Sequence, residues 1–427
     1  MAMRTRISCS VLHAPIVALL LALLLGGCGS TPDQRTQRAN VVIVVSVDGL
    51  RSDAIGSGRM PTLDRLAEQG VHAEWMTPSY PTLTFPNHYT LVTGLRPDHH
   101  GIVNNTMRDP VLGKFSLDNR AAVEDPRWWG GEPIWVTLQK HGGSAATMFW
   151  PGSEAAIAGQ HPRYWHPFDA AVTATQRVDQ VLAWLDLAGG QRPGFITLYF
   201  DQVDHAGHED GPHSAGTIAA MGQVDAALQR LLAGLESRGL RDRIDLIVVS
   251  DHGMADVPRS REALLDERIA ADAIDVLTYG QVVGLSAVAG REQEVGAALL
   301  GRHDHYACWR KGELPARWHY GTHPRIPPIV CQADAGWELT THARRKPRAP
   351  LRGAHGYAPE TTDMRAVFVA IGPDFGSGKR IGAFDNVDVY RLLAGLLSIP
   401  AQANDGELAP LLPALSAAGR ARVATQP

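Results

Sequence analysis

The sequence has little of several features that mark particular classes of protein. Its 427 residues include 4 cysteines, too few for a small secreted scaffold held together by disulfides. It has no run of lysine and arginine, and its formal net charge is −4, which together argue against a surface that coats nucleic acid. Hydrophobic residues make up 44% and charged residues 20%, so disorder is not expected. This length predicts one large α/β domain with an insertion, or two domains.

The N-terminal segment lacks an apolar run long enough to span a bilayer comfortably. Arg4 and Arg6 precede an apolar run over residues 14–27, which ends in Leu25-Gly26-Gly27-Cys28. A basic start followed by a short apolar run is typical of a cleaved signal peptide. The end of the run resembles the lipobox of bacterial lipoproteins, which implies cleavage before Cys28 and acylation of that residue.

We therefore expect residues 1–27 to be a signal peptide and the polar residues 28–40 to be a lipoprotein tether. A lipid at Cys28 would give the protein its membrane contact, on the periplasmic side of a bacterial cell envelope. The alternative is an ordinary secretory signal whose cleavage site lies near a cysteine.

Only two cysteines, Cys308 and Cys331, remain in the mature part of the chain. In an oxidising envelope two thiols predict a disulfide. The alternative is a pair of buried free thiols. A zinc site built on these two is disfavoured, because neither has a partner at the Cys-x-x-Cys spacing.

Three apolar runs each lead to an aspartate. The runs are Val41–Val47, Phe195–Phe200 and Ile244–Ser250, and the aspartates are Asp48, Asp204 and Asp251. Continuous Val/Ile/Leu runs predict strands of a parallel sheet that is covered by helices on both faces. Ligands bind such sheets outside the carboxyl ends of the strands, so the three carboxylates are expected to face one site. Histidines follow two of them, and carboxylates mixed with imidazoles are what a hydrolytic zinc site requires.

Alternating strands and helices predict a doubly wound α/β fold. Helical patterns cover residues 60–70, 87–93, 173–188, 213–238 and 387–397, and a further strand is expected at 366–371. The stretch from about 258 to 352 interrupts this rhythm and is predicted to be a small α+β insertion. We therefore expect a catalytic domain over residues 41–400. The tail, 401–427, is expected to be frayed beyond Pro410.

The stretch around Thr84 has the features of a helix start. Pro86 fits the first turn of a helix, which places Thr84 just before the helix N-terminus. Free backbone N–H groups and the helix dipole favour anions there, so a hydroxyl at this point could attack a phosphoryl group. Taken alone, a threonine in this position is more often a simple helix cap.

Several short motifs occur together in an order that resembles the nucleotide pyrophosphatase/phosphodiesterase family of the alkaline phosphatase superfamily. The resemblance extends over roughly residues 41–397. Each motif alone is weak, whereas the ordered set is specific. The motifs begin at Asp48-Gly49-Leu50-Arg51, Pro81-Thr82-Leu83-Thr84, His99-His100-Gly101, Phe149-Trp150-Pro151-Gly152, Asp204-His205-Ala206-Gly207-His208, Ser250-Asp251-His252-Gly253 and Gly353-Ala354-His355-Gly356.

The resemblance implies an alkaline phosphatase-like fold, two Zn²⁺ ions and a threonine nucleophile. It assigns Thr84 as the nucleophile and Asn105 as the amide that holds a non-bridging phosphoryl oxygen. One zinc would be held by Asp48, Thr84, Asp251 and His252, and the other by Asp204, His208 and His355. A threonine hydroxyl is a poor nucleophile at neutral pH, and a bound zinc can stabilise its alkoxide. A covalent phospho-threonine intermediate is the resulting hypothesis.

The resemblance also implies the substrate class. Monoesterases of the superfamily commonly use an arginine to hold two charged phosphoryl oxygens, whereas Asn105 is a neutral donor that suits a diester. Phe85 and Tyr199 match aromatic residues that sandwich a nucleobase, although Tyr199 on a buried strand could equally fill the core. We therefore predict hydrolysis of nucleotide phosphodiester or pyrophosphate bonds to nucleoside 5′-monophosphates.

Three alternatives stay open at this point: a lipid phosphodiesterase that cleaves choline-phosphate head groups, a phosphomonoesterase, and an inactive nucleotide-binding protein. A choline site would need an aromatic or acidic cage, which the Trp-rich insertion could supply. Several histidines near the motifs are left without a ligand role. His205 is expected to lie on a loop and point elsewhere, and His88 and His100 are expected mainly to pack. Sequence alone leaves the oligomeric state unknown.

Overall fold

The computed structural model of the protein describes residues 41–258, 260–345 and 352–424. The predicted signal peptide, residues 1–27, and the predicted tether with Cys28, residues 28–40, lie outside the described residues. Within the described ranges, no helix combines the length and the apolar character needed to cross a membrane.

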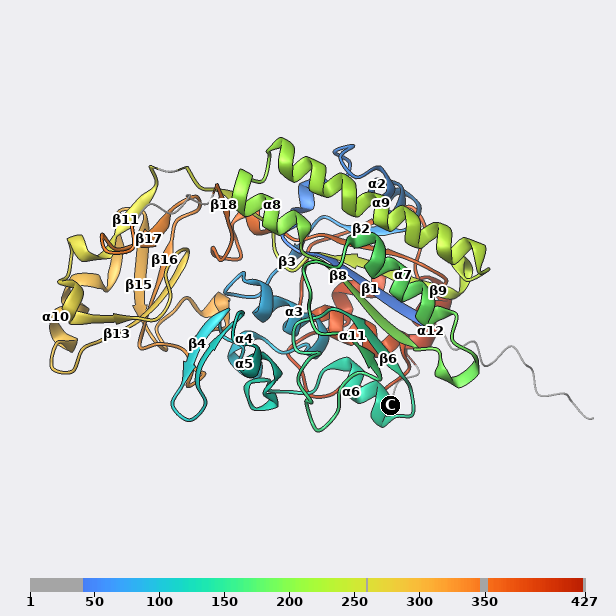
Figure 1. Cartoon of the computed structure of the whole chain (residues 1–427), viewed down its shortest axis with the longest axis horizontal. Helices are drawn as coiled ribbons and strands as arrows, with labels where there is room; N and C mark the ends of the chain where they lie inside the picture. Colours follow the sequence, from blue (N-terminus) through green and yellow to red (C-terminus); the bar gives the residue numbers. More distant parts are fainter. Residues whose placement is uncertain (1–40, 259, 346–351, 425–427) are drawn as a thin grey trace, which may run out of the picture. The chain divides into compact units, whose positions relative to one another are not determined.

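A mostly parallel eight-stranded sheet forms the centre of the described residues (Figure 1). Seven strands run in the same direction, and β19 is antiparallel to both of its neighbours. The prediction of a doubly wound α/β fold is confirmed. In spatial order the strands are β20 (Lys379–Ile381), β2 (Val71–Ala73), β19 (Phe368–Ile371), β9 (Ile244–Val249), β1 (Val41–Val47), β8 (Phe195–Phe200), β6 (Ala145–Met148) and β7 (Tyr164–Trp165).

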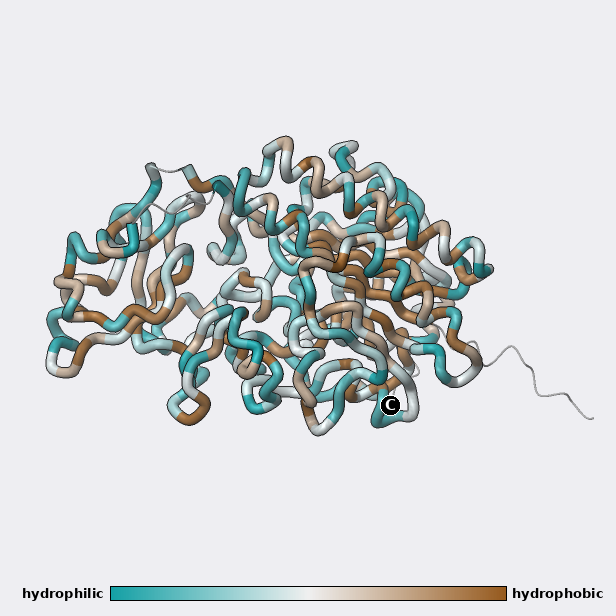
Figure 2. The backbone as a smooth tube through the Cα atoms, viewed as in Figure 1, coloured by the Kyte–Doolittle hydropathy of each residue, from teal (hydrophilic) through white to brown (hydrophobic). Residues whose placement is uncertain are grey.

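Helices cover both faces of this sheet because its central strands are mostly apolar and are buried on both sides. In β1, Val42 and Val44 contribute to one hydrophobic cluster, while Ile43 and Val45 contribute to the other. Figure 2 shows the hydrophobic strands enclosed by more polar helices. The first face is covered by α3 (Thr84–Thr93), α6 (Ile134–Lys140), α11 (Asp388–Leu396) and α12 (Ala417–Ala424), and the second by α2 (Pro61–Gln69), α7 (Ala174–Leu185) and α9 (Ala215–Ser237).

The region predicted as an α+β insertion contains a second, antiparallel sheet of five strands. One helix, α10 (Glu292–Leu299), packs on it through Val295 and Leu299. In spatial order the strands are β12 (Ile274–Val276), β13 (Val282–Ala287), β16 (Ile329–Ala333), β15 (Tyr306–Arg310) and β14 (Gly301–His303). Cys308 and Cys331 lie directly opposite each other on β15 and β16 and form a disulfide, so the predicted bond is confirmed.

Two local predictions are wrong. Between Pro410 and residue 424 the chain is not frayed: α12 forms there, and Leu411, Leu415 and Val423 are buried in the main core. The Ala-rich tail has few large apolar side chains and only a weak helical pattern in its sequence. Those few side chains nevertheless pack against α11. The helix at the nucleophile begins earlier than expected, since Thr84 is the first residue of α3 and does not precede it.

Candidate active site

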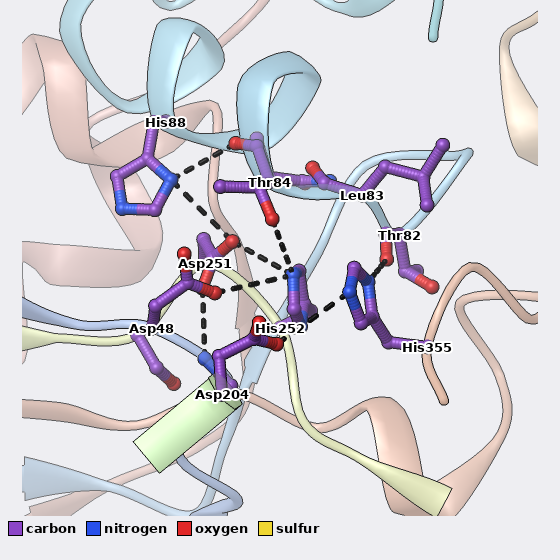
Figure 3. Close-up of polar contacts among 12 residues, drawn as sticks. Asp48, Thr82, Leu83, Thr84, His88, Asp204, Asp251, His252 and His355 are labelled. Atoms are coloured by element: carbon purple, nitrogen blue, oxygen red, sulfur yellow. Dashed lines mark hydrogen bonds and ion pairs between the residues drawn. The ribbon is translucent and has the colours of Figure 1, made fainter. Parts of the chain in front are cut away.

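Three neighbouring strands deliver the three aspartates to one edge of the sheet. Asp48 follows β1 directly, and Asp251 lies just beyond the end of β9. Asp204 lies on α8 (Gln202–Asp210), the helix that follows β8. Because β8, β1 and β9 are adjacent and parallel, their carboxyl ends meet at the same place, as Figure 3 shows for the side chains.

The segment that carries Asp204 is a helix, which corrects the expectation that His205 lies on a loop. Asp204 and His208 stand one helical turn apart and therefore share a face of α8. His205, expected on a loop, lies on the same helix, with its side chain 72% exposed and close to Glu209. The prediction that His205 stays outside the ligand set agrees with this position, although the reason is helical spacing and not loop geometry.

The carboxylates and imidazoles form two compact groups. Each residue of a group offers one nitrogen or oxygen atom, and these atoms lie within 4.8 Å of one another. The rings of His252 and His355 stack at 3.6 Å between centroids, so the two groups are immediate neighbours. The first group is Asp48, Asp251 and His252, and the second is Asp204, His208 and His355.

All three histidines are held in the same way. In each ring Nδ1 donates to a backbone carbonyl, which leaves the Nε2 lone pair of the neutral ring free. Each Nε2 lies toward a carboxylate of its own group. His208 donates to Gly353 O at 2.8 Å, His355 to Thr82 O at 2.9 Å and His252 to Gly253 O at 2.9 Å.

The carboxylate oxygens that face these nitrogens lack donors. Asp48 Oδ1, Asp204 Oδ1 and Asp251 Oδ2 are buried and accept no hydrogen bond from the described part of the chain. His252 Nε2 lies 2.8 Å from Asp251 Oδ2 and 3.5 Å from Asp48 Oδ1. Two lone pairs this close repel each other unless a proton or a metal cation lies between them. A buried, unpaired carboxylate is also costly.

The electrostatics lead to the same conclusion. Burial raises the pKa of Asp48 well above its ordinary value, and the carboxylates of Asp251 and Asp204 raise it further. Burial lowers the pKa of His355 well below its ordinary value, and His252 and His208 lower it further. Burial opposes a charge on His252, but the Asp251 carboxylate outweighs this effect and raises the pKa of His252 above its ordinary value. Carboxylates and imidazoles packed this closely form a donor set that fits metal ions.

Thr84 stands beside the first group. Its Oγ1 lies 3.3 Å from His252 Nε2, and its side chain is almost fully buried at the start of α3 (Figure 3). The N-cap of α3 is Leu83, which makes no side-chain cap. Thr84 therefore does not serve as the helix cap, and its hydroxyl is available for chemistry at a helix N-terminus.

Asn105 is oriented by the same helix start. Its Oδ1 accepts a hydrogen bond of 3.0 Å from the backbone N–H of Phe85, the residue after Thr84. Because an N–H donor must meet the amide oxygen, the NH₂ end of Asn105 is the part left to donate to a ligand. Asn105 is thus bound to the backbone of the residue that follows Thr84, the predicted nucleophile.

Tyr199 corrects a predicted role. Its ring is only 8% exposed, and its hydroxyl donates to Asp48 Oδ2 at 2.6 Å. A ring this buried offers little surface to a base, and its hydroxyl orients a carboxylate of the first group. The neighbouring ring of Phe168, 40% exposed and 6.0 Å from Tyr199, is the accessible aromatic. Sequence reasoning missed Phe168, because a single phenylalanine in a loop carries no periodic signal.

His88 has a larger part than packing. Its ring is fully buried, and Nδ1 donates to the carbonyl oxygen of Thr84 at 2.9 Å. Nε2 accepts from Ser46 Oγ at 2.8 Å, and Asp251 Oδ2 lies 3.4 Å from Nδ1. His88 therefore ties the first residue of α3 to β1 and to the first carboxylate group.

The comparisons with known proteins agree with this geometry. The family described as type I phosphodiesterase / nucleotide pyrophosphatase matches residues 42–358. The chain belongs to the type I phosphodiesterase/nucleotide pyrophosphatase family. Members bearing this name are hydrolases that act on phosphoric ester bonds, and this chain is an enzyme of that class.

Individual relatives are similar over most of this chain. An uncharacterized pyrophosphatase/phosphodiesterase of Schizosaccharomyces pombe is 36% identical over 88% of this chain and 80% of its own length. Ectonucleotide pyrophosphatase/phosphodiesterase family member 3 of Rattus norvegicus is 35% identical over 86% of this chain, which spans only 43% of that relative. Murine ectonucleotide pyrophosphatase/phosphodiesterase 5, solved as an inactive variant with AMP, is 33% identical with a TM-score of 0.83, covering 88% of this chain and all of that chain.

Replacing Tyr199 with phenylalanine should weaken metal binding by about 10–100-fold, because Asp48 loses the donor that orients it. Bound metal is measured by elemental analysis after titration with a chelator. Tyr89→Phe is the matched control, since the Tyr89 hydroxyl is buried without a hydrogen-bond partner among the described residues. Equal metal retention in Tyr199→Phe and Tyr89→Phe would contradict this role.

Proposed function

We propose that the protein is a di-zinc nucleotide pyrophosphatase/phosphodiesterase that releases nucleoside 5′-monophosphates through a phospho-threonine intermediate. The observation that carries this proposal is the position of Thr84 at a helix N-terminus beside two adjoining carboxylate–imidazole groups. Carboxylate and imidazole ligands without thiolates, three from each group, suit zinc in a hydrolytic site. Asp48, Asp251 and His252 with Thr84 would hold one ion, and Asp204, His208 and His355 the other.

Metal ions bound at these groups would stabilise charge on the attacking and leaving oxygens. Thr84 Oγ1 loses its proton to solvent and attacks phosphorus, and the bond from phosphorus to the leaving oxygen breaks. Water then attacks the phospho-threonine, the bond to Thr84 Oγ1 breaks, and Thr84 regains a proton. Throughout, the Asn105 NH₂ group and the N-terminus of α3 hold a non-bridging oxygen.

The proposed substrate is a nucleotide diester or anhydride. Asn105 is a neutral donor, which suits a phosphoryl group carrying one charged oxygen fewer than a monoester. The accessible ring of Phe168 and the half-buried ring of Phe85 provide apolar faces for a base. The AMP present in the murine relative's structure supports the same substrate class.

The choline-phosphate alternative finds less support. Trp318 of the Trp-rich region is only 4% exposed and stacks on Tyr80 at 4.3 Å, and Trp337 stacks on His305 at 3.4 Å. These rings already have partners and leave no open aromatic cage of the kind that binds quaternary ammonium groups. An inactive nucleotide-binding protein is disfavoured, because Thr84 and all of the proposed ligands are present.

Thr84→Ala should lower kcat on the order of 10⁴-fold or more, because the attacking oxygen is lost. Both metals should stay bound, because three carboxylate or imidazole ligands remain in each group. Rates are compared on thymidine-5′-p-nitrophenyl ester, bis-p-nitrophenyl phosphate, p-nitrophenyl phosphate and p-nitrophenyl phosphorylcholine, with and without chelator. We expect the nucleotide ester to be the best substrate and chelator to abolish activity. Preference for p-nitrophenyl phosphate or for the choline ester would replace the proposed substrate class.

Phe168→Ala should raise KM for the thymidine ester by about 5–100-fold, because base stacking contributes about 1–3 kcal/mol. It should leave KM for bis-p-nitrophenyl phosphate nearly unchanged, since that substrate carries no base. Ile218→Ala, at a side chain of similar exposure on α9, is the control. Parallel losses on both substrates would show that Phe168 supports the fold and does not contact the base.

We further propose that the mature protein is lipid-anchored at Cys28 on the periplasmic side of a bacterial envelope. The proposal rests on the sequence, in which a basic start and a short apolar run lead to Leu25-Gly26-Gly27-Cys28.

The anchor is tested by mass spectrometry of protein extracted from membranes. We expect an acylated N-terminal Cys28, and Cys28→Ser should release the protein into the soluble fraction. A mature protein that begins at any other residue without a lipid would rule the anchor out.

A further inference from the structure

Residues 318–325, which lie between β15 and β16, contact both loops that carry the proposed catalytic groups. We call this stretch the bracing segment. Trp318 stacks on Tyr80 with the ring planes 10° apart, and Tyr320 meets the same ring edge-on at 5.1 Å. Tyr80 is fully buried and precedes the nucleophile Thr84 by one short turn of chain. The bracing segment therefore packs against the loop that leads from Tyr80 to Thr84, which we call the nucleophile loop.

The second contact is made through Asp98. This carboxylate, on α4 (Pro97–His100), is only 6% exposed although it carries a charge. It accepts hydrogen bonds from three successive backbone N–H groups of the bracing segment and from one hydroxyl. The donors are Gly321 N at 3.2 Å, Thr322 N at 2.9 Å, Thr322 Oγ1 at 2.6 Å and His323 N at 2.8 Å.

The third contact is made through Arg325, whose side chain is 9% exposed. Its guanidinium lies 4.7 Å from the centre of the Trp128 ring. It donates to three backbone carbonyls and one carboxylate, so that all three nitrogen atoms of the guanidinium form hydrogen bonds. The acceptors are Gly101 O at 2.9 Å, Trp128 O at 2.6 Å, Arg127 O at 3.0 Å and Asp109 Oδ2 at 2.9 Å.

These contacts hold the chain both before and after Asn105. Arg325 binds Gly101 O and the Tyr320 hydroxyl donates to Val103 O at 3.0 Å, both before Asn105. Arg325 also binds Asp109, which ends β4 (Thr106–Asp109) just after it. The intervening stretch, residues 101–105, forms no regular helix or strand, so its position depends on these bonds. Gly101 leaves no room for a side chain, because a Cβ there would lie 2.9 Å from His323 Nε2 and 3.0 Å from Arg325 Nη1.

We propose that the bracing segment sets the position of the Asn105 amide, with Arg325 and Asp98 as positioning residues for the reaction. This inference rests on the proposed function, in which Asn105 holds a non-bridging phosphoryl oxygen. An amide that stabilises a transition state must stay within a few tenths of an ångström of its place. In a loop outside regular secondary structure, the single bond from Phe85 N–H to Asn105 Oδ1 needs support from the surrounding contacts. The five-stranded sheet region thus takes part in catalysis without touching the substrate.

The test is a double-mutant cycle between Arg325→Lys and Asn105→Ala. A lysine keeps the charge but cannot reach all four acceptors, so Arg325→Lys should lower kcat about 10–100-fold and change KM less than about threefold. In the Asn105→Ala background the same substitution should have almost no further effect, because its target is gone. Arg238→Lys, which loosens a bidentate contact to Asp186 away from the site, measures the general cost of such a change.

A second measurement separates positioning from stability. The Rp and Sp phosphorothioate forms of the thymidine ester differ only in which non-bridging position carries sulfur. Since Asn105 donates to one of these positions, Arg325→Lys should reduce the ratio of the two rates toward the value found for Asn105→Ala. Arg238→Lys should keep the ratio of the unmodified enzyme.

The outcomes distinguish this inference from the proposed function. If Asn105→Ala leaves kcat unchanged, the proposed role of Asn105 is wrong and the inference fails with it. If Asn105→Ala lowers kcat but Arg325→Lys lowers it equally in both backgrounds, or keeps the phosphorothioate ratio, only the positioning role is overturned. Should Arg325→Lys fail to fold, Asp98→Asn replaces it in the same double-mutant cycle, because it weakens the hydrogen bonds between Asp98 and the bracing segment.

Discussion

The structure depends on the meeting of three carboxylates, two of them fully buried, at the carboxyl ends of β8, β1 and β9. One oxygen of each of Asp48, Asp204 and Asp251 is buried without a hydrogen-bond donor among the described residues. Burial raises the pKa of Asp48, and the nearby carboxylates of Asp251 and Asp204 raise it further. Their repulsion is unfavourable for the fold by itself, and the stable hydrophobic sheet beneath them is what holds them there. A site of this kind gains its stability from the ions that it binds, so that metal binding and local order are linked.

Hydrogen bonds around the carboxylates connect the two groups to the nucleophile. Tyr199 orients Asp48, and His88 joins the carbonyl of Thr84 to β1. His355, from the second group, donates to Thr82, which lies in the nucleophile loop. A displacement of either group would therefore change the position of Thr84. Hydrogen bonds thus connect segments of the site that are far apart in the chain.

The strands and the ligand types could be read from the sequence because each has a local signature. β1 and β8 have the predicted bounds, since a continuous apolar run between polar residues has few other structures available. Weakly patterned elements were not predicted in the same way. The tail that forms α12 packs through a few apolar side chains, and β6 and β7 carry too short a pattern to be recognised. Phe168 was missed for the same reason, and Tyr199 was given the role that fits Phe168 better.

The sequence by itself determined the fold class, the order of the motifs and the chemical character of the site. Those properties depend on residue type and on spacing along the chain, both of which are present before folding. Only the tertiary structure decided which oxygen of Asp48 is free, which ring near the site is accessible, and that Asp98 and Arg325 brace the Asn105 loop. These depend on contacts between residues far apart in the chain, 151 positions for Tyr199 and Asp48 and 224 positions for Arg325 and Gly101, and no local pattern encodes such contacts.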